Sequence, residues 1–248
     1  MDNFMITKKK LKRIVLSDKQ VRNIASLNYE ELANLFGEDF SEMKGYSQNN
    51  PHHNLDLMQH TLAVVLGIQE TCLSKEEFSD LRIAALFHDI AKPIVKQEKN
   101  DRFVYYGHAE KSMEIADVLL QEYGFTPNDI KRILFFIRFH DAFIPFKLQT
   151  EMTEYRNPHL LIVNRENVRK IIGQICLESN RVLGFNPTAR DFDLLINHFC
   201  RADQNAQAET VIYQGKIIDN RSAKKKRLVH VYQHFYQEYQ SGTLIRTI

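Results

Sequence analysis

The chain has 248 residues, of which 44% are hydrophobic and 26% are charged, and its formal net charge is +2. This is the composition of an ordinary globular protein. It contains no apolar run near the ~18 residues of a membrane span, and Met1 to Arg13 lacks the apolar core of a secretory signal. Cys72, Cys176 and Cys200 form no Cys-x-x-Cys pair, so we predict buried free thiols in a reducing cytoplasm and no membrane partner.

The positive charge is concentrated in two clusters, at residues 8–13 and at residues 221–227. Each contains five lysines or arginines, and acidic residues are in excess over the rest of the chain. Basic ends on an acidic body could contact RNA phosphates. The alternative is that both clusters are solvated helix faces without a partner.

Nine glycines and six prolines in 248 residues are few, and the apolar spacing is mostly helical. We therefore predict an all-α fold, a single helical bundle over residues 1–248 with a motif-bearing core at 51–207. Residues 1–50 are predicted to be a helical extension, with a helix over 18–37 that breaks near Asn28.

The next two predicted helices form a hairpin. Asp56 is a suitable N-cap for a helix over 57–72, which carries His60 near its start. Ser74 is a suitable N-cap for the following helix, which we predict to end at Pro93.

Residues 95–106 are the least helical stretch, and we predict a short β-hairpin there. Gly107 precedes a helix that begins at His108. Thr126-Pro127 is a typical helix start, and that helix ends at His140-Asp141. Three further helices are predicted: one from Asn164 to about Ser179, one from Asn186-Pro187 to about residue 208, and a C-terminal one over 220–241.

His88 and Asp89 are adjacent at the end of an apolar helical run. Neighbouring helix positions diverge by roughly 100°, so these two side chains can converge only on something between them, such as a divalent metal. Lys92 lies four residues after His88 and could offer an ammonium to a bound anion. The doublet alone is equally compatible with a helix-end histidine beside a solvated aspartate.

Further ligand-type residues lie where other helices meet loops, namely His60, His108, His140 and Asp203. Each alone has an ordinary interpretation: a half-buried core histidine, a solvated helix start, a histidine that favours a helix C-terminus, or a surface charge.

Together these residues resemble the H…HD…D pattern of the HD-domain family of metal-dependent phosphohydrolases, read here as His60, His88-Asp89 and Asp203. The resemblance covers residues 51–207 and is most specific to the HD region of bacterial tRNA nucleotidyltransferases, the CCA-adding enzymes. The matching segments are HNLDLMQHT (53–61), RIAALFHDIAKP (82–93), FVYYGHAE (103–110), RFH (138–140) and RAD (201–203).

The resemblance implies one or two divalent metal ions, of Mn, Fe, Ni, Zn, Co or Mg. It assigns one metal to His60, His88, Asp89 and Asp203. A second metal, bridged by Asp89, is assigned with less certainty to His108 and His140. Lys92 would bind phosphate, and His53 and Asp141 would orient ligands or substrate.

The implied function is hydrolysis of a phosphomonoester or phosphodiester by metal-activated water, with a nucleotide or a 2′,3′-cyclic phosphate end as substrate. Neither a nucleotidyltransferase head, with its glycine-rich turn and paired carboxylates, nor a Gly-Tyr-Pro motif is found, so neither CCA addition nor cyclic-di-GMP hydrolysis is implied. The alternatives are an RNA-end or single-strand nuclease and a non-catalytic nucleotide- or RNA-binding module.

Overall fold

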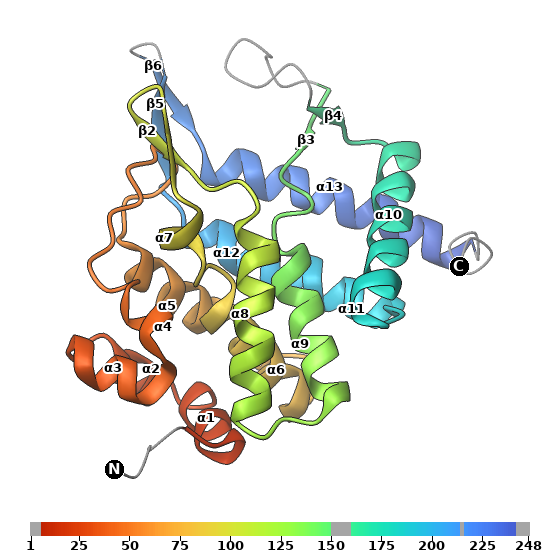
Figure 1. Cartoon of the computed structure of the whole chain (residues 1–248). Coiled ribbons are helices and arrows are strands. Elements are labelled where there is room, and N and C mark those ends of the chain that lie inside the picture. The colour runs from red at the N-terminus through yellow and green to blue at the C-terminus, as the bar shows by residue number, and fades with distance from the viewer. Residues whose placement is uncertain (1–5, 150–159, 214–215, 242–248) are drawn as a thin grey trace.

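A computed structural model describes residues 6–149, 160–213 and 216–241 (Figure 1). The predicted all-α class is confirmed, since the described chain is mainly helical with short two-stranded sheets. The helices are α1 (Lys8–Val15), α2 (Asp18–Ile24), α3 (Tyr29–Phe36), α4 (Glu38–Ser41), α5 (Leu57–Gly67), α6 (Lys75–Phe87), α7 (Lys92–Val95), α8 (His108–Glu122), α9 (Pro127–Phe139), α10 (Arg165–Leu183), α11 (Ala189–Asp193), the π-helix η2 (Leu194–Cys200), α12 (Arg201–Asn205) and α13 (Arg221–Gln240).

The sheets are small pairs at the periphery. The predicted hairpin near residues 95–106 is present as β1 (Gln97–Lys99) and β2 (Arg102–Val104). Two pairs were not predicted: the parallel β3 (Phe146–Lys147) and β4 (Leu161–Ile162), and the antiparallel β5 (Thr210–Tyr213) and β6 (Lys216–Asp219).

Side-chain caps fix where the helices begin. Asp56 Oδ1 accepts a hydrogen bond from the backbone N–H of Gln59 at the start of α5. Ser74 and Glu77 form a reciprocal capping box at the start of α6, with bonds of 3.1 and 2.8 Å. Because such caps satisfy N–H groups that the helix itself leaves unpaired, these two starts agree with the sequence prediction. Asn28 likewise caps α3 and breaks the predicted 18–37 helix.

Two predicted helix ends are wrong. The helix that begins at Leu57 ends at Gly67, where a Cβ would lie 3.3 Å from Cβ of Ala202, and not at Cys72. Cys72 lies in the following loop with φ of 63° and is exposed, whereas the other two cysteines are buried as predicted. The helix that carries the His-Asp doublet ends at Phe87, and Pro93 lies in the first turn of α7. A proline is compatible with a first turn because its missing N–H would have no helical partner there.

The predicted helix from Asn186-Pro187 differs in two respects. Thr188 caps it, so it begins slightly later, and seven of its residues form the π-helix η2. A π-helix has a wider turn than an α-helix, so it changes the direction in which later side chains point. Asp203 lies in α12, which follows η2 directly, and its orientation therefore depends on this segment.

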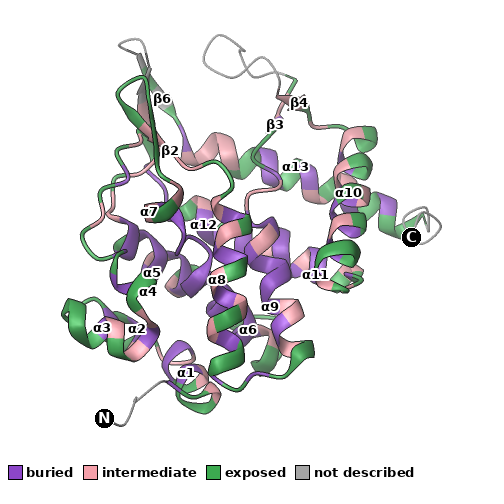
Figure 2. Ribbon diagram, viewed as in Figure 1, coloured by how far each residue is buried: buried purple, intermediate pink, exposed green. Residues whose placement is uncertain are grey.

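The core of the bundle is organised around α6. Every residue from Phe78 to Phe87 is buried, and α5, α8, α9 and η2 pack around this helix. The buried apolar side chains form one cluster that extends from Ile6 to Phe235 (Figure 2). The C-terminal end of α6 thus lies in the interior, beside α12, while α13 runs past α12 at the end of the bundle remote from α1 (Figure 1). Among the helices that the structure describes, none has the length and apolar character needed to cross a bilayer.

Candidate metal centre

Five chain segments meet where α6 ends. They contribute one histidine from α5, the doublet that follows α6, the first residue of α8, the residue that follows α9, and one aspartate from α12. These residues are His60, His88, Asp89, His108, His140 and Asp203. All are at least 94% buried except the half-buried His108. The structure therefore brings together all six residues that the sequence assigned to a metal.

Asp89 lies at the centre of the group, and its two oxygens face different histidines. Oδ2 lies 3.6 Å from Nε2 of His60 and 3.2 Å from Nε2 of His88. Oδ1 lies 3.3 Å from Nε2 of His108 and 3.7 Å from Nε2 of His140. This is the position that a carboxylate needs to bridge two adjacent cations.

Asp203 completes one side of the group. Its Oδ1 lies 3.1 Å from Nε2 of His60 and 3.9 Å from Nε2 of His88. His60, His88 and Asp203 therefore present three ligand atoms within 4.8 Å of one another. A second such set is His88 with Asp89 and His140.

A third set of ligand atoms joins His108 and His140 to Asp141, which lies at the edge of the centre. The two imidazoles come from different helices, and Asp141 follows His140 directly in the chain. This set corresponds to the less certain second metal position of the sequence analysis, with Asp141 as an additional oxygen donor.

The ring orientation is fixed by the backbone. Nδ1 of His88, His108 and His140 lies 2.7–2.8 Å from the carbonyl oxygen three residues earlier in the chain. Nδ1 of His60 lies 3.4 Å from the carbonyl of Ala206. Because a carbonyl only accepts, each Nδ1 must carry the hydrogen, and in a neutral ring Nε2 then bears a lone pair. All four lone pairs are directed to the carboxylates at the centre.

This arrangement leaves ligand atoms unsatisfied. Nε2 of His60, Nε2 of His88 and Oδ1 of Asp89 are buried without a hydrogen-bond partner in the described chain. Nε2 of His108 and His140 face each other at 3.1 Å, although two lone pairs cannot form a hydrogen bond. An unsatisfied buried polar atom costs about 1–3 kcal/mol, and a divalent cation would satisfy several at once. The donor set therefore fits the metal ions that the sequence analysis expects.

Protonation favours the same interpretation. Burial lowers the pKa of His88 and lowers that of His108 to about 4, so both rings are neutral at pH 7, as metal ligands must be. Burial opposes ionisation of Asp89, yet the Lys92 ammonium beside it helps to hold the pKa of Asp89 well below its usual value. Asp89 is thus charged.

Lys92 contacts the centre, but by a different route from the one predicted. It is not on one continuous helix with His88, since α6 ends before the doublet. Its Nζ lies 2.6 Å from Oδ2 of Asp89 and donates a 3.0 Å hydrogen bond to Oε1 of Gln48. Lys92 is only 6% exposed, so a buried ammonium lies directly beside the proposed metal position.

His53 and Asp141, the two residues predicted to orient ligands or substrate, both line the pocket above the centre. The ring of His53 packs edge-on against His60, with centroids 4.9 Å apart, and burial lowers its pKa to about 2. Gln48 and Gln207 were not predicted, because isolated glutamines carry no recognisable motif. Both are buried beside the centre.

The pocket has a volume of about 290 Å³, and its floor includes the charged Asp89 and Lys92 beside the neutral ring of His108. Its lining also includes Tyr106 and Ile144, which come from separate loops. These two side chains are 63% and 52% exposed, so the rim is apolar while the floor is charged.

Comparison with known proteins agrees with this geometry. The HD domain family model matches residues 57–165, which include all four histidines and Asp89 but not Asp203. The CC-adding tRNA nucleotidyltransferase of Thermus thermophilus is 30% identical over 140 residues, which are 56% of this chain and 32% of that protein. The chain thus matches about a third of the length of this relative. No solved structure matches the chain.

HD domains bind divalent metals and generally act as metal-dependent hydrolases, and the predicted His and Asp residues converge here as such a site requires. Residues 57–165 of the chain are thus similar to the HD domain, whose family generally consists of metal-dependent hydrolases.

Proposed function

We propose that this protein hydrolyses a phosphoester of a nucleotide, with one or two divalent metals bound by the six converging His and Asp residues. The observation that carries the proposal is the position of Asp89, whose two oxygens face two different pairs of histidines while its neighbour Lys92 supplies a buried ammonium. A purely structural cluster would not require four imidazoles with their lone pairs directed inward.

Bound divalent ions would lower the pKa of a water molecule and stabilise charge on the phosphoryl oxygens. The protein supplies the rest. The backbone carbonyls that hold Nδ1 of each histidine keep the ligand set preorganised. Lys92 would donate a hydrogen bond to a phosphoryl oxygen, an interaction that strengthens as negative charge grows in the transition state.

The apolar rim supports a nucleotide as substrate. A phosphate on the charged floor would leave the rest of the ligand beside Tyr106 and Ile144 at the mouth of the pocket. An exposed aromatic ring provides a face on which a base can stack, which contributes about 1–3 kcal/mol. A sugar phosphate or inorganic phosphate would gain nothing from such a rim.

A 2′,3′-cyclic phosphate end is one form of this substrate. The similar protein from Thermus thermophilus is named for its action on tRNA, and such an end on RNA is a phosphodiester that a metal-dependent hydrolase could open. Whether the preferred bond is a monoester or a diester decides between a nucleotidase and a cyclic phosphodiesterase.

RNA contact through the two basic clusters, and with it a nuclease activity, stays a prediction. The clusters lie at opposite ends of the bundle, on α1 and on α13 (Figure 1). In the first cluster, Lys8 is paired with Asp129 at 2.5 Å and Lys12 lies 3.8 Å from Asp80. One continuous RNA surface formed by both clusters is therefore not favoured.

The first experiment measures metal binding without turnover. Protein stripped with a chelator should gain thermal stability with Mn²⁺, Ni²⁺, Co²⁺ or Zn²⁺, because an ion that binds only the folded state stabilises it. Elemental analysis should give at least one metal per chain. A stripped protein that shows no thermal shift with any of these ions would contradict the assignment of the centre.

The second experiment measures hydrolysis with the loaded protein. The substrates are 2′-, 3′- and 5′-mononucleotides, nucleoside 2′,3′-cyclic phosphates, and a short single-stranded RNA as the nuclease control. We expect release of phosphate or opening of the cyclic ester, and loss of either in Asp89→Ala. Tight nucleotide binding without turnover would instead support the non-catalytic module, and degradation of RNA alone would support the nuclease.

A further inference from the structure

A second cleft lies beside the metal centre, between the loop that precedes α5 and the turn of the β1–β2 hairpin. We call it the hairpin cleft; its walls are formed by residues between 45 and 56 and by Asp101 and Arg102. Its volume is about 550 Å³, which is in the size range of small-molecule sites. The hairpin cleft is therefore large enough to hold part of a substrate.

The hairpin cleft adjoins the metal centre at His53 and Gln48. His53 lines both the cleft and the 290 Å³ pocket above the centre. Gln48 lines the cleft, and its Oε1 accepts the hydrogen bond from Lys92. A ligand whose phosphate lies beside Lys92 can thus extend over His53 into the cleft.

The hairpin cleft and the apolar rim lie on different sides of Asp89. His53, at the cleft, packs against His60, which faces Oδ2 of Asp89. The rim residues belong to the segments that carry His108 and His140, which face Oδ1. A phosphate held at Asp89 therefore has room for one substituent on each side.

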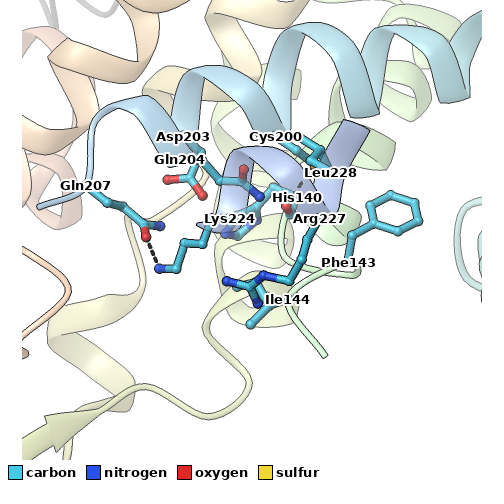
Figure 3. Close-up of a pocket in the computed structure, with 10 residues that line it drawn as sticks. All are labelled: His140, Phe143, Ile144, Cys200, Asp203, Gln204, Gln207, Lys224, Arg227 and Leu228. Atoms are coloured by element: carbon cyan, nitrogen blue, oxygen red, sulfur yellow. Dashed lines mark hydrogen bonds between the residues drawn. The ribbon is translucent and has the colours of Figure 1, made fainter. Parts of the chain in front are cut away.

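Toward α13, the described part of the chain leaves no such room. The space that His140, Asp203 and Lys224 line beside this helix has a volume of only about 20 Å³ (Figure 3). Gln207 also lines it and accepts a hydrogen bond from the Lys224 ammonium (Figure 3). Since such a space holds roughly one water molecule, a substrate would extend toward the rim and the hairpin cleft instead.

Hydrogen bonds between the two walls of the hairpin cleft hold it open. The backbone N–H of Phe103 donates to the carbonyl of Asn49 at 3.1 Å, and the side-chain amide of Asn49 donates to the carbonyl of Asp101 at 3.3 Å. The hydroxyl of Tyr105 donates to the carbonyl of Gln48 at 2.7 Å. Because the walls are already fixed, binding would lose little free energy to ordering them.

The lining of the hairpin cleft suits an uncharged polar group. Ser47, Asn54 and Arg102 are exposed, and their side chains form no hydrogen bond or ion pair within the described residues. The charged groups of the lining are the carboxylates of Asp56 and Asp101 and one guanidinium, so the balance is negative. This balance disfavours a second phosphate, whereas hydroxyl, amide and guanidinium groups can bond the sugar and the base edges of a nucleoside.

We propose, relying on the hydrolase function proposed above, that the hairpin cleft binds a nucleoside and that the substrate is a phosphodiester joining two nucleosides. One nucleoside would lie at the rim formed by Tyr106 and Ile144, the phosphate at the metal centre, and the other nucleoside in the cleft. Water would attack phosphorus and one P–O ester bond would break. The leaving nucleoside oxygen would take up a proton, and the phosphate would stay on the other nucleoside.

The negative balance of the hairpin cleft also limits the length of the ligand. A nucleoside in the cleft that carried a further phosphate would place this phosphate beside two carboxylates. The ligand is therefore a free dinucleotide or the end of a strand, and the experiment separates these two sources.

The test is calorimetric binding to the Mn²⁺-loaded full chain, so it does not depend on turnover. The ligands are the dinucleotide ApA, adenosine 5′-methyl phosphate and a hexa-adenylate, each with sulfur in the linkage to slow hydrolysis. ApA and the methyl diester carry the same charge, so the ratio of their affinities measures the second nucleoside alone.

The test variant combines Arg102→Met with Asn54→Leu, which removes two polar groups from the wall of the hairpin cleft. Lys99→Met is the matched control, because Lys99 is exposed, pairs with Arg102 across the hairpin and does not line the cleft. Melting temperatures of both variants show that they are folded.

We expect ApA to bind wild type about tenfold more tightly than the methyl diester does. The test variant should reduce this advantage to about twofold or less, whereas Lys99→Met should retain it. Hexa-adenylate that binds as tightly as ApA identifies a strand end, and weaker binding identifies a free dinucleotide.

The proposal would be overturned if ApA had no advantage in wild type, if the test variant retained it, or if Lys99→Met lost it equally. The hydrolase function would survive each of these results as long as the protein hydrolyses a phosphoester of the substrate panel. If wild type binds none of the ligands and hydrolyses no phosphoester, both proposals fail.

Discussion

The substitution Lys92→Met distinguishes a residue that serves the metal centre from one that only supports the fold. The wild-type ammonium lies 2.6 Å from Oδ2 of Asp89, and both groups are buried. At an effective dielectric constant of about 20, two unit charges at this separation attract by roughly 6 kcal/mol, part of which offsets desolvation. Breaking such a buried pair costs about 3–5 kcal/mol, because Asp89 is left without its cation.

We therefore expect the metal-free variant to lose about 3 kcal/mol of stability. In a chain of this size, that loss lowers the melting temperature by about 6–12 °C. A divalent ion that binds Asp89 replaces the missing cation, so the deficit should fall below about 1 kcal/mol once metal is added. The metal-induced rise in melting temperature should accordingly be larger in Lys92→Met than in wild type by about 4–8 °C.

Added metal should stabilise Lys92→Met more than wild type, but the activity of the variant should fall. Loss of an ammonium that stabilises phosphoryl charge should lower kcat/KM by ~10- to 1000-fold, which corresponds to about 1.4–4 kcal/mol of transition-state stabilisation. The assays are thermal unfolding with and without Mn²⁺, and kinetics on whichever phosphoester the substrate panel identifies. Lys96→Met is the matched control, because Lys96 is exposed and lies over the ring of Phe103.

The reasoning would be refuted if Lys92→Met were equally destabilised with and without metal. That result would assign Lys92 a packing role independent of the centre. Unchanged kcat/KM in the loaded variant would separately remove it from the reaction.

Three further predictions concern other residues. Asp89→Ala should lower hydrolysis at least ~1000-fold. His108→Ala or His140→Ala should lower hydrolysis less and release only the second metal, which elemental analysis would show. A folded Asp89→Ala variant with wild-type turnover would exclude the assignment. Arg82→Met should lower the unfolding free energy, measured in urea, by about 3–5 kcal/mol. The guanidinium of Arg82 is only 2% exposed and donates hydrogen bonds to the carbonyls of Ile68 and Val15, which lie in two other segments of the chain. A loss below about 1 kcal/mol would contradict this prediction. Glu77→Gln should lower the unfolding free energy by about 1 kcal/mol above pH 5, because contact with Arg190 lowers the pKa of Glu77 to about 2. As the pH falls to about 2, wild-type Glu77 becomes protonated and the difference in unfolding free energy should vanish. A difference that does not change with pH would refute this prediction.

Much of the fold was accessible from the sequence because the signals are local. Ser74 and Asp56 cap helices through bonds to residues three positions away, so spacing alone identifies those starts. Helix ends were less predictable. At the end of α5, Gly67 lies against Ala202, which is distant in the sequence, and spacing within the helix carries no record of this contact.

The metal ligands were predicted as a set, since the resemblance to a known family links residues on five separate segments of the chain. Their roles were not. Only the tertiary structure shows that the oxygens of Asp89 face His88 on one side and His108 on the other, because side-chain orientation depends on where separate helices end.

The sequence by itself determined the helical class, the local caps and the residues that form the centre, because periodicity and short motifs record local geometry. The tertiary structure alone decided which neighbours those residues meet. It placed Lys92 on Asp89 although α6 had already ended, and it turned Lys224 inward while Lys225 stays in solvent. Such relations arise from packing between segments far apart in the chain, and composition and spacing carry no record of that packing.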